Sequence, residues 1–162
     1  MKLPLFALAG ALLVTTAPAT SQGIVVSAET AAVDRVSRDL DRNLLRAEGF
    51  RRQPTGEGLA MVRFYRGADG LPADVTLYRG SGRRDVDRIA LRAVSRLGRA
   101  VPLPDAGGDG QIFQANIILA NSHRAHAALA SEMVRLEQAR LADPRERSVF
   151  AFGSRPQAVA AS

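Results

Sequence analysis

The stretch from Gly80 to Arg96 joins a Gly-Ser-Gly turn to an arginine-rich helical pattern, a combination that can bind phosphate. A Walker loop needs a lysine followed by serine or threonine after its last glycine, and the only lysine of the chain is Lys2. A dinucleotide-binding loop needs a third glycine where Asp85 stands, and this carboxylate would repel a pyrophosphate. The turn is therefore predicted to be structural: Gly82 allows a tight corner and Asp85 caps the following helix.

The helical pattern after the turn carries arginines at spacings near four, roughly opposite its apolar stripe. A basic helix can bind nucleic acid, but the chain has no nucleic-acid-binding motif and only 5% aromatic residues. We predict a solvated face and no nucleic-acid partner; attraction to anionic envelope surfaces is the alternative. The residues concerned are Arg84, Arg88, Arg92, Arg96 and Arg99.

No cluster of reactive residues is evident. The chain has no cysteine, which excludes disulfides, thiolate metal sites and thiol catalysis. His123 and His126 have a spacing that can bind a metal, but no third ligand is obvious, so we assign them to the surface. Ser81 has no base near it in the sequence. We predict no enzyme activity, no cofactor and no metal.

The N-terminus has the pattern of a secretion signal. Lys2 precedes the apolar run from Leu3 to Val14, and Ala17-Pro18-Ala19 fits an Ala-x-Ala cleavage site. The run is short for a bilayer span of about 20 residues. We predict a signal peptide over residues 1–19, cleaved after Ala19; an uncleaved inner-membrane anchor is the alternative.

The rest of the chain alternates between patterns typical of helices and strands. Residues 20–32 are small and weakly apolar and are predicted to be a linker. Residues 33–122 form the predicted domain, a tail helix follows over 123–142, and 143–162 are predicted to be disordered. Within the domain, a helix over 32–47 precedes strands over 58–66 and 73–79, the helix after Gly82, and a strand over 111–119. This order predicts an α+β fold: a three-stranded antiparallel sheet covered by helices, with an extra C-terminal helix.

The third predicted strand could lie at an edge of this sheet. An edge strand has free N–H and C=O groups that can accept a peptide strand. The alternatives are that the tail helix covers this edge or that it pairs in a homodimer.

Two motifs resemble the C-terminal domain of TonB proteins. The first runs from Glu57 to Phe64 (EGLAMVRF) and is followed by Asp69-Gly70; the second is GSGRRDVDRIALRAV, from Gly80 to Val94. The segment RAVPLP, from Arg99 to Pro104, is similar to the Pro-rich segment of that family. The resemblance covers about residues 57–119.

The resemblance implies a periplasmic, non-enzymatic module. TonB proteins pass energy from the inner-membrane proteins ExbB and ExbD to outer-membrane receptors, and their last strand takes up a receptor peptide. For this chain it implies binding of an extended peptide from an envelope protein or outer-membrane receptor. A membrane-anchored energy transducer with ExbB and ExbD, and a self-associating structural envelope protein, are the alternatives. The resemblance also implies that Ser81, Gly82 and Asp87 form a corner that determines the fold. It implies a strand that pairs with the partner peptide, made of Gln111, Ile112, Phe113, Gln114, Ala115, Asn116, Ile117, Ile118 and Leu119.

Overall fold

The computed structural model describes residues 22–49, 56–105, 107–108 and 110–153. The predicted signal peptide over residues 1–19 lies outside these ranges, as does the tail from 154 onward.

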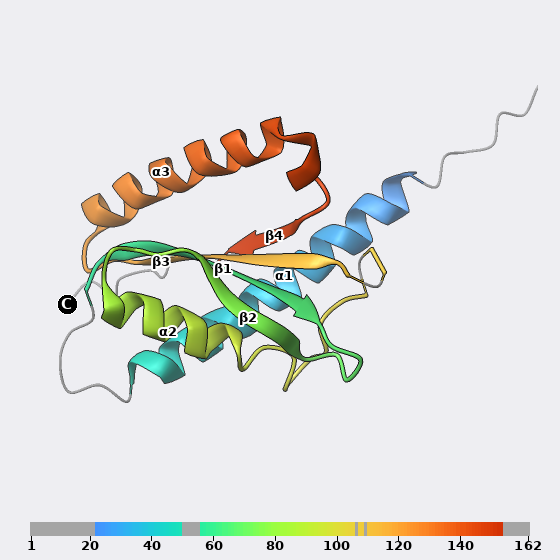
Figure 1. Ribbon diagram of the computed structural model, residues 1–162, viewed down its shortest axis with the longest axis horizontal. Coiled ribbons are helices and arrows are strands. Elements are labelled where there is room, and N and C mark those ends of the chain that lie inside the picture. The colour runs from blue at the N-terminus through green and yellow to red at the C-terminus, as the bar shows by residue number, and fades with distance from the viewer. Residues whose placement is uncertain (1–21, 50–55, 106, 109, 154–162) are drawn as a thin grey trace, which may run out of the picture.

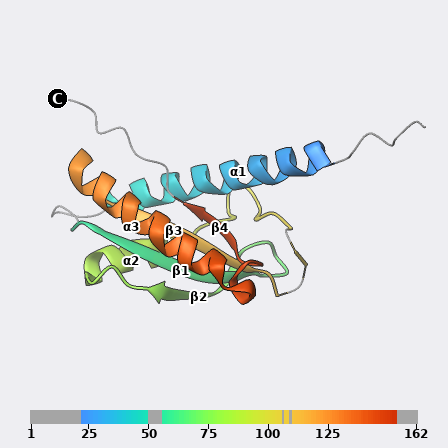
Figure 2. The ribbon, with the colours of Figure 1, turned by 90° about the horizontal axis from the view of Figure 1, so that it is seen from above.

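The fold has three layers built on one sheet (Figure 1). Helices α1 (Gln22–Glu48) and α2 (Arg84–Val94) lie on one face, and α3 (His123–Ala142) lies on the other. The strands have the order β2-β1-β3-β4, and Figure 2, which views the fold from above, shows α3 lying across them. The bounds of the remaining elements are Gly58–Arg66 for β1, Pro72–Arg79 for β2, Ile112–Leu119 for β3, Pro144–Glu146 for the short helix η1 and Phe150–Gly153 for β4.

The core lies between the sheet and the helices α1 and α2. Alternation along β1 and β3 directs every second side chain toward these helices, because successive side chains of a strand point to opposite faces. Phe64 and Phe113 are opposite one another in the two strands, and their rings stack with centroids 5.4 Å apart. Helix α2 covers them with its apolar stripe, which is buried as its helical spacing predicts. The members of that stripe are Val86, Ile89, Ala90, Ala93 and Val94.

The α+β class is confirmed, but the predicted three-stranded antiparallel sheet is wrong. The sheet has four strands, and β4 pairs with β3 in parallel. The prediction of disorder after residue 142 is therefore wrong for 143–153, which contain η1 and β4. The fourth strand is ordered because Phe152 reaches the core, where it is 4% exposed.

The predicted linker over residues 20–32 is also wrong from Gln22 onward, because α1 begins there. In addition, Asp39, which helical periodicity places on the outer side of the helix, is only 4% exposed. Within the described part of the chain, no helix is both long enough and apolar enough to cross a bilayer.

Two glycines with positive φ provide a matched pair for a stability prediction. Gly98 has φ +78°, and a Cβ there would lie 2.8 Å from the backbone oxygen of Gly70; Gly82 has φ +79° with nothing within 4 Å of such a Cβ. We expect Gly82→Ala to cost about 1 kcal/mol for the backbone conformation alone. Gly98→Ala should lower the free energy of unfolding by roughly 1 kcal/mol more than Gly82→Ala, because the added methyl group must also displace the backbone at Gly70. Urea unfolding measures both; equal losses would contradict the close approach of Gly98 to Gly70.

Candidate functional site

Strand β3 was predicted as a possible open edge, and the structure places it inside the sheet. It pairs with β1 along its whole length, from Ile112 opposite Tyr65 to Leu119 opposite Gly58. On its other side it pairs with β4 over Phe113–Asn116. The predicted open edge is therefore wrong over these four residues, and neither proposed cover, α3 or a second copy, is what occupies it. Of the predicted partner strand, only Gln111 lies outside β3, directly before it.

Strand β4 is held against β3 by two aromatic side chains. Phe152 meets the edge of the Phe64 ring at 6.2 Å between centroids, and Phe150 lies 5.2 Å from Phe113. At the end of the strand the backbones are close, since a Cβ on Gly153 would lie 3.3 Å from the Asn116 carbonyl oxygen. The site thus has three parts: the backbone groups of β3 that pair with β4, an apolar socket that holds the ring of Phe152, and a close approach of the two backbones where a small residue such as Gly153 fits.

The two residues that precede β4, Ser148 and Val149, are held in place by contacts with the rest of the fold. The side chain of Gln111 donates from Nε2 to the Ser148 carbonyl oxygen at 2.6 Å, and Val149 is 7% exposed. These contacts position the chain for pairing from Phe150 onward. Among the described strands, β4 is the shortest, with four residues.

The opposite face of β3 carries a buried polar cluster. Gln114 is fully buried and accepts a hydrogen bond at Oε1 from Arg63 Nε at 2.9 Å. Its Nε2 donates to Asn116 Oδ1 at 2.9 Å and to Glu137 Oε1 at 2.7 Å. One residue of the predicted partner strand, Gln114, therefore links α3 to the sheet through its side chain.

Arg63 connects this cluster to η1. Its guanidinium forms an ion pair with Glu146 and lies over the Tyr78 ring, 3.4 Å from the ring centroid. Arg140 pairs with Glu137 at 2.8 Å and also donates to the Glu146 carbonyl oxygen. A cavity of about 510 Å³ lies beside these groups, between α3 and the strands β1 and β2. Helix α3 is thus attached mainly by polar contacts, and its apolar side chains Leu129, Met133 and Leu136 are only half-buried.

The corner before α2 is closed by Asp87. Its Oδ1 accepts from the Ser81 N–H and from Ser81 Oγ, both at 2.7 Å, and Gly82 has φ +79°. Ser81 and Asp87 thus bind one another, and none of the three corner residues lines the cavity beside α3. The prediction that Asp85 caps α2 is wrong, since Arg83 occupies the N-cap position and its side chain makes no capping bond.

Asp85 instead binds the segment before β1. Its Oδ2 accepts from the Gly56 N–H at 2.8 Å, and this hydrogen bond lowers the pKa of Asp85 from 3.8 to about 2. Because the folded-state pKa is below the ordinary value, the contribution to stability is present above pH 3.8 and is lost as the pH falls toward 2.

We therefore expect Asp85→Asn to make the melting temperature less dependent on pH in this acid window, since the substituted side chain does not titrate. Thermal melts of both proteins across that window measure the difference. Parallel pH profiles for the wild type and the variant would contradict the assignment.

The remaining candidate residues lie at the surface. Arg84, Arg88, Arg92 and Arg99 are exposed and Arg96 is half-buried, as expected for a solvated face. His123 and His126 are at the start of α3, where His123 is exposed and His126 is half-buried. No group of three or more possible metal ligands occurs among the described residues.

Sequence reasoning missed β4 and the residues around Arg63. The local signal for β4 is weak, because the alternation Phe150-Ala151-Phe152 is short. No local signal indicated that Arg63, Gln114 and Glu146 meet.

A comparison of the chain with protein-family models, curated proteins and solved structures found no match.

Proposed function

We propose that this protein is a non-enzymatic, periplasmic, TonB-like module that binds an extended peptide by strand addition beside β3. The peptide would come from an envelope or outer-membrane transport protein. The observation that carries the proposal is the parallel pairing of Phe150–Gly153 with Phe113–Asn116. This side of β3 accepts a short extended segment, and here the chain supplies that segment itself.

The pairing also suggests what a partner peptide must contain. Backbone hydrogen bonds supply affinity in strand addition, and pockets for alternate side chains supply specificity. The pocket here is the aromatic socket beside Phe64 and Phe113, which Phe152 fills. A partner should therefore carry an aromatic residue at the position of Phe152 and a small residue directly after it. The second position should be small because the backbone at Gly153 lies close to the carbonyl oxygen of Asn116.

The resemblance to TonB proteins supports the same site. The order β1, β2, α2, β3 over Gly58–Leu119 is the order that the resemblance implies, and that family takes up its peptide on the last strand of the domain. Strand β4 and helix α3 are additions to that pattern. On this proposal β4 is a resident strand that a partner peptide replaces. Periplasmic localisation rests on the signal-like N-terminal pattern; energy transduction with ExbB and ExbD would require an uncleaved anchor.

The experiment uses the full chain and a labelled peptide with the sequence SVFAFG, copied from residues 148–153. Phe152→Ala weakens the resident strand and should increase affinity for this peptide in a fluorescence anisotropy titration. Ile89→Ala is the matched control, because it destabilises the core from α2, which does not contact β4. Equal affinities of the two variants would refute the proposal, as would unchanged binding of a peptide in which the second phenylalanine is serine.

A second candidate is self-association, and the same short strand favours it. Exchange of Phe150–Gly153 between two copies would preserve every contact of β4 and yield a homodimer. Light scattering over a range of protein concentrations measures this directly. A dimer whose formation is abolished by free SVFAFG peptide would favour exchange of this strand.

A further inference from the structure

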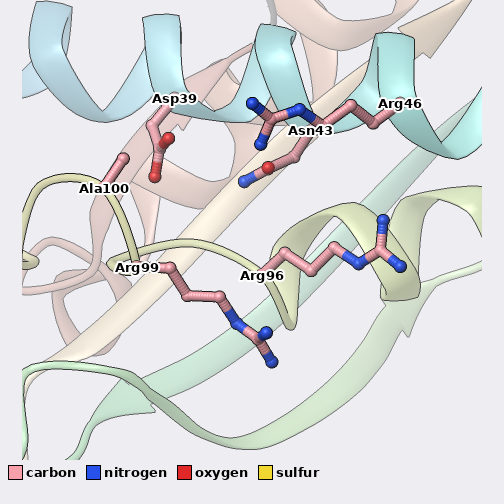
Figure 3. A pocket seen from close by; sticks show the side chains of 6 residues that line it. All are labelled: Asp39, Asn43, Arg46, Arg96, Arg99 and Ala100. Carbon is pink, nitrogen blue, oxygen red and sulfur yellow. The ribbon is translucent and has the colours of Figure 1, made fainter.

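A second cavity lies between α1 and the turn that follows α2, away from the β3–β4 edge. Its volume is about 240 Å³. Figure 3 shows side chains from α1 on one wall and from residues 96–100 on the other. The lining residues are Asp39, Asn43, Arg46, Arg96, Arg99 and Ala100.

Asn43 is the least expected of these residues. Its side chain is only 3% exposed, and its Nδ2 is buried without a hydrogen-bond partner. Buried amide groups in folded proteins almost always have a partner, from the protein or from a bound molecule. In Figure 3 the amide of Asn43 lies in the space between the two walls, where a ligand oxygen could accept its hydrogen bond.

The charge of the cavity is strongly positive. Arg46, Arg96 and Arg99 form no ion pair with a carboxylate of the described residues. Among the described lining residues the one carboxylate is that of Asp39, and it already has partners: its Oδ1 pairs with Arg42 at 2.9 Å, and its Oδ2 accepts from the Gly98 N–H at 3.2 Å. The three guanidinium groups therefore have no anionic partner at this site.

We infer that this cavity binds a phosphate group of an anionic ligand. Guanidinium groups bind phosphate through paired, charge-assisted hydrogen bonds, and three of them with one amide donor match a dianion with several acceptor oxygens. The volume is several times the roughly 30 Å³ that one water molecule occupies in the liquid, so a phosphate monoester fits. Figure 3 shows the guanidinium of Arg46 beside Asn43, while Arg96 and Arg99 start from the opposite wall and their guanidinium groups point away from Asn43. Their long side chains can turn toward a bound anion, because Arg46 and Arg99 are exposed and Arg96 is half-buried.

The test is a calorimetric titration of the full chain with inorganic phosphate and with glycerol phosphate, at constant ionic strength set by chloride. We expect saturable binding that the double variant Arg96→Gln/Arg99→Gln weakens by about ten-fold or more, since two charge-assisted contacts are lost. The double variant Arg88→Gln/Arg92→Gln removes the same charge from the exposed face of α2 and should leave the affinity nearly unchanged. Asn43→Leu should also weaken binding, and circular dichroism establishes that each variant is folded.

Vesicles containing phosphatidic acid distinguish a lipid headgroup from a free phosphate. If the ligand is a headgroup, the vesicles bind the chain, glycerol phosphate competes with them, and the Arg96/Arg99 variant loses binding. If it is a soluble phosphate, glycerol phosphate binds and the vesicles do not. Absence of saturable binding to every phosphate probe would overturn the inference. Equal losses in the two double variants would also overturn it, because the attraction would then be general.

Discussion

Replacing Phe152 with alanine is expected to lower the free energy of unfolding by about 3 kcal/mol, the lower end of the range for a buried phenylalanine. Phe152 is 4% exposed, and its ring meets Phe64 at 6.2 Å between centroids. The change removes the only side chain of β4 that is fully buried. Because β4 is short and pairs on one side with β3, the loss should be concentrated in this strand.

Urea unfolding gives the total change, and amide hydrogen exchange locates it. We expect the amides of Phe150–Gly153 to lose protection in the variant, while those of β1 opposite β3 keep theirs. A uniform loss of protection over the whole sheet would contradict the view that β4 opens as a separate unit. Ile89→Ala should show that uniform pattern, since Ile89 belongs to the main core.

Replacing Arg63 with methionine is expected to cost about 3 kcal/mol, near the lower end for breaking a buried ion pair because the site is partly accessible. The side chain of Arg63 is 15% exposed and that of Glu146 is 25% exposed. Methionine keeps much of the volume but leaves the Glu146 carboxylate and the Gln114 oxygen without the donor they now have. The attachment of η1 and of the end of α3 should weaken most.

Arg79→Met is the matched control for this change. Arg79 pairs with Glu132 at 3.3 Å, but the two side chains are 48% and 38% exposed. Such a surface pair contributes about 0–1 kcal/mol, so its loss should be small. Urea unfolding of both variants, with limited proteolysis of α3, measures the contrast; similar losses would mean that the Arg63 cluster contributes no more than a surface ion pair.

The elements with strong local patterns could be predicted from the sequence. Strand β1 has the predicted bounds, β3 differs by one residue at its start, and α2 buries the predicted stripe from Val86 to Val94. In these segments the period of apolar residues is sufficient, because each buries one face against the same core.

The fourth strand could not be placed in this way. Its four residues contain only two aromatic side chains in alternation, which is too short a pattern to separate a strand from a loop. Phe150 pairs with Phe113, and the whole of α3 lies between these two residues in the sequence. Parallel pairing between segments so far apart in the sequence cannot be predicted from the residues of either strand alone.

The anion-binding cavity was missed for a related reason. Helical periodicity places Asp39 on the solvent side of α1, yet it is buried against the turn at Gly98, whose N–H it accepts. Asn43 lies one helical turn further along α1, is also buried, and lines the same cavity as residues 96, 99 and 100. Contacts between residues 39–46 and 96–100 depend on how two helices dock, which the pattern of either helix alone does not contain.

The most direct test of strand addition beside β3 is an amide NMR titration of the Phe152→Ala chain with the SVFAFG peptide. We predict that the largest shifts fall on Phe113–Asn116, and that a peptide lacking the second phenylalanine leaves these amides unchanged. Shifts confined to other elements, or none at millimolar peptide in the folded variant, would contradict the proposed function.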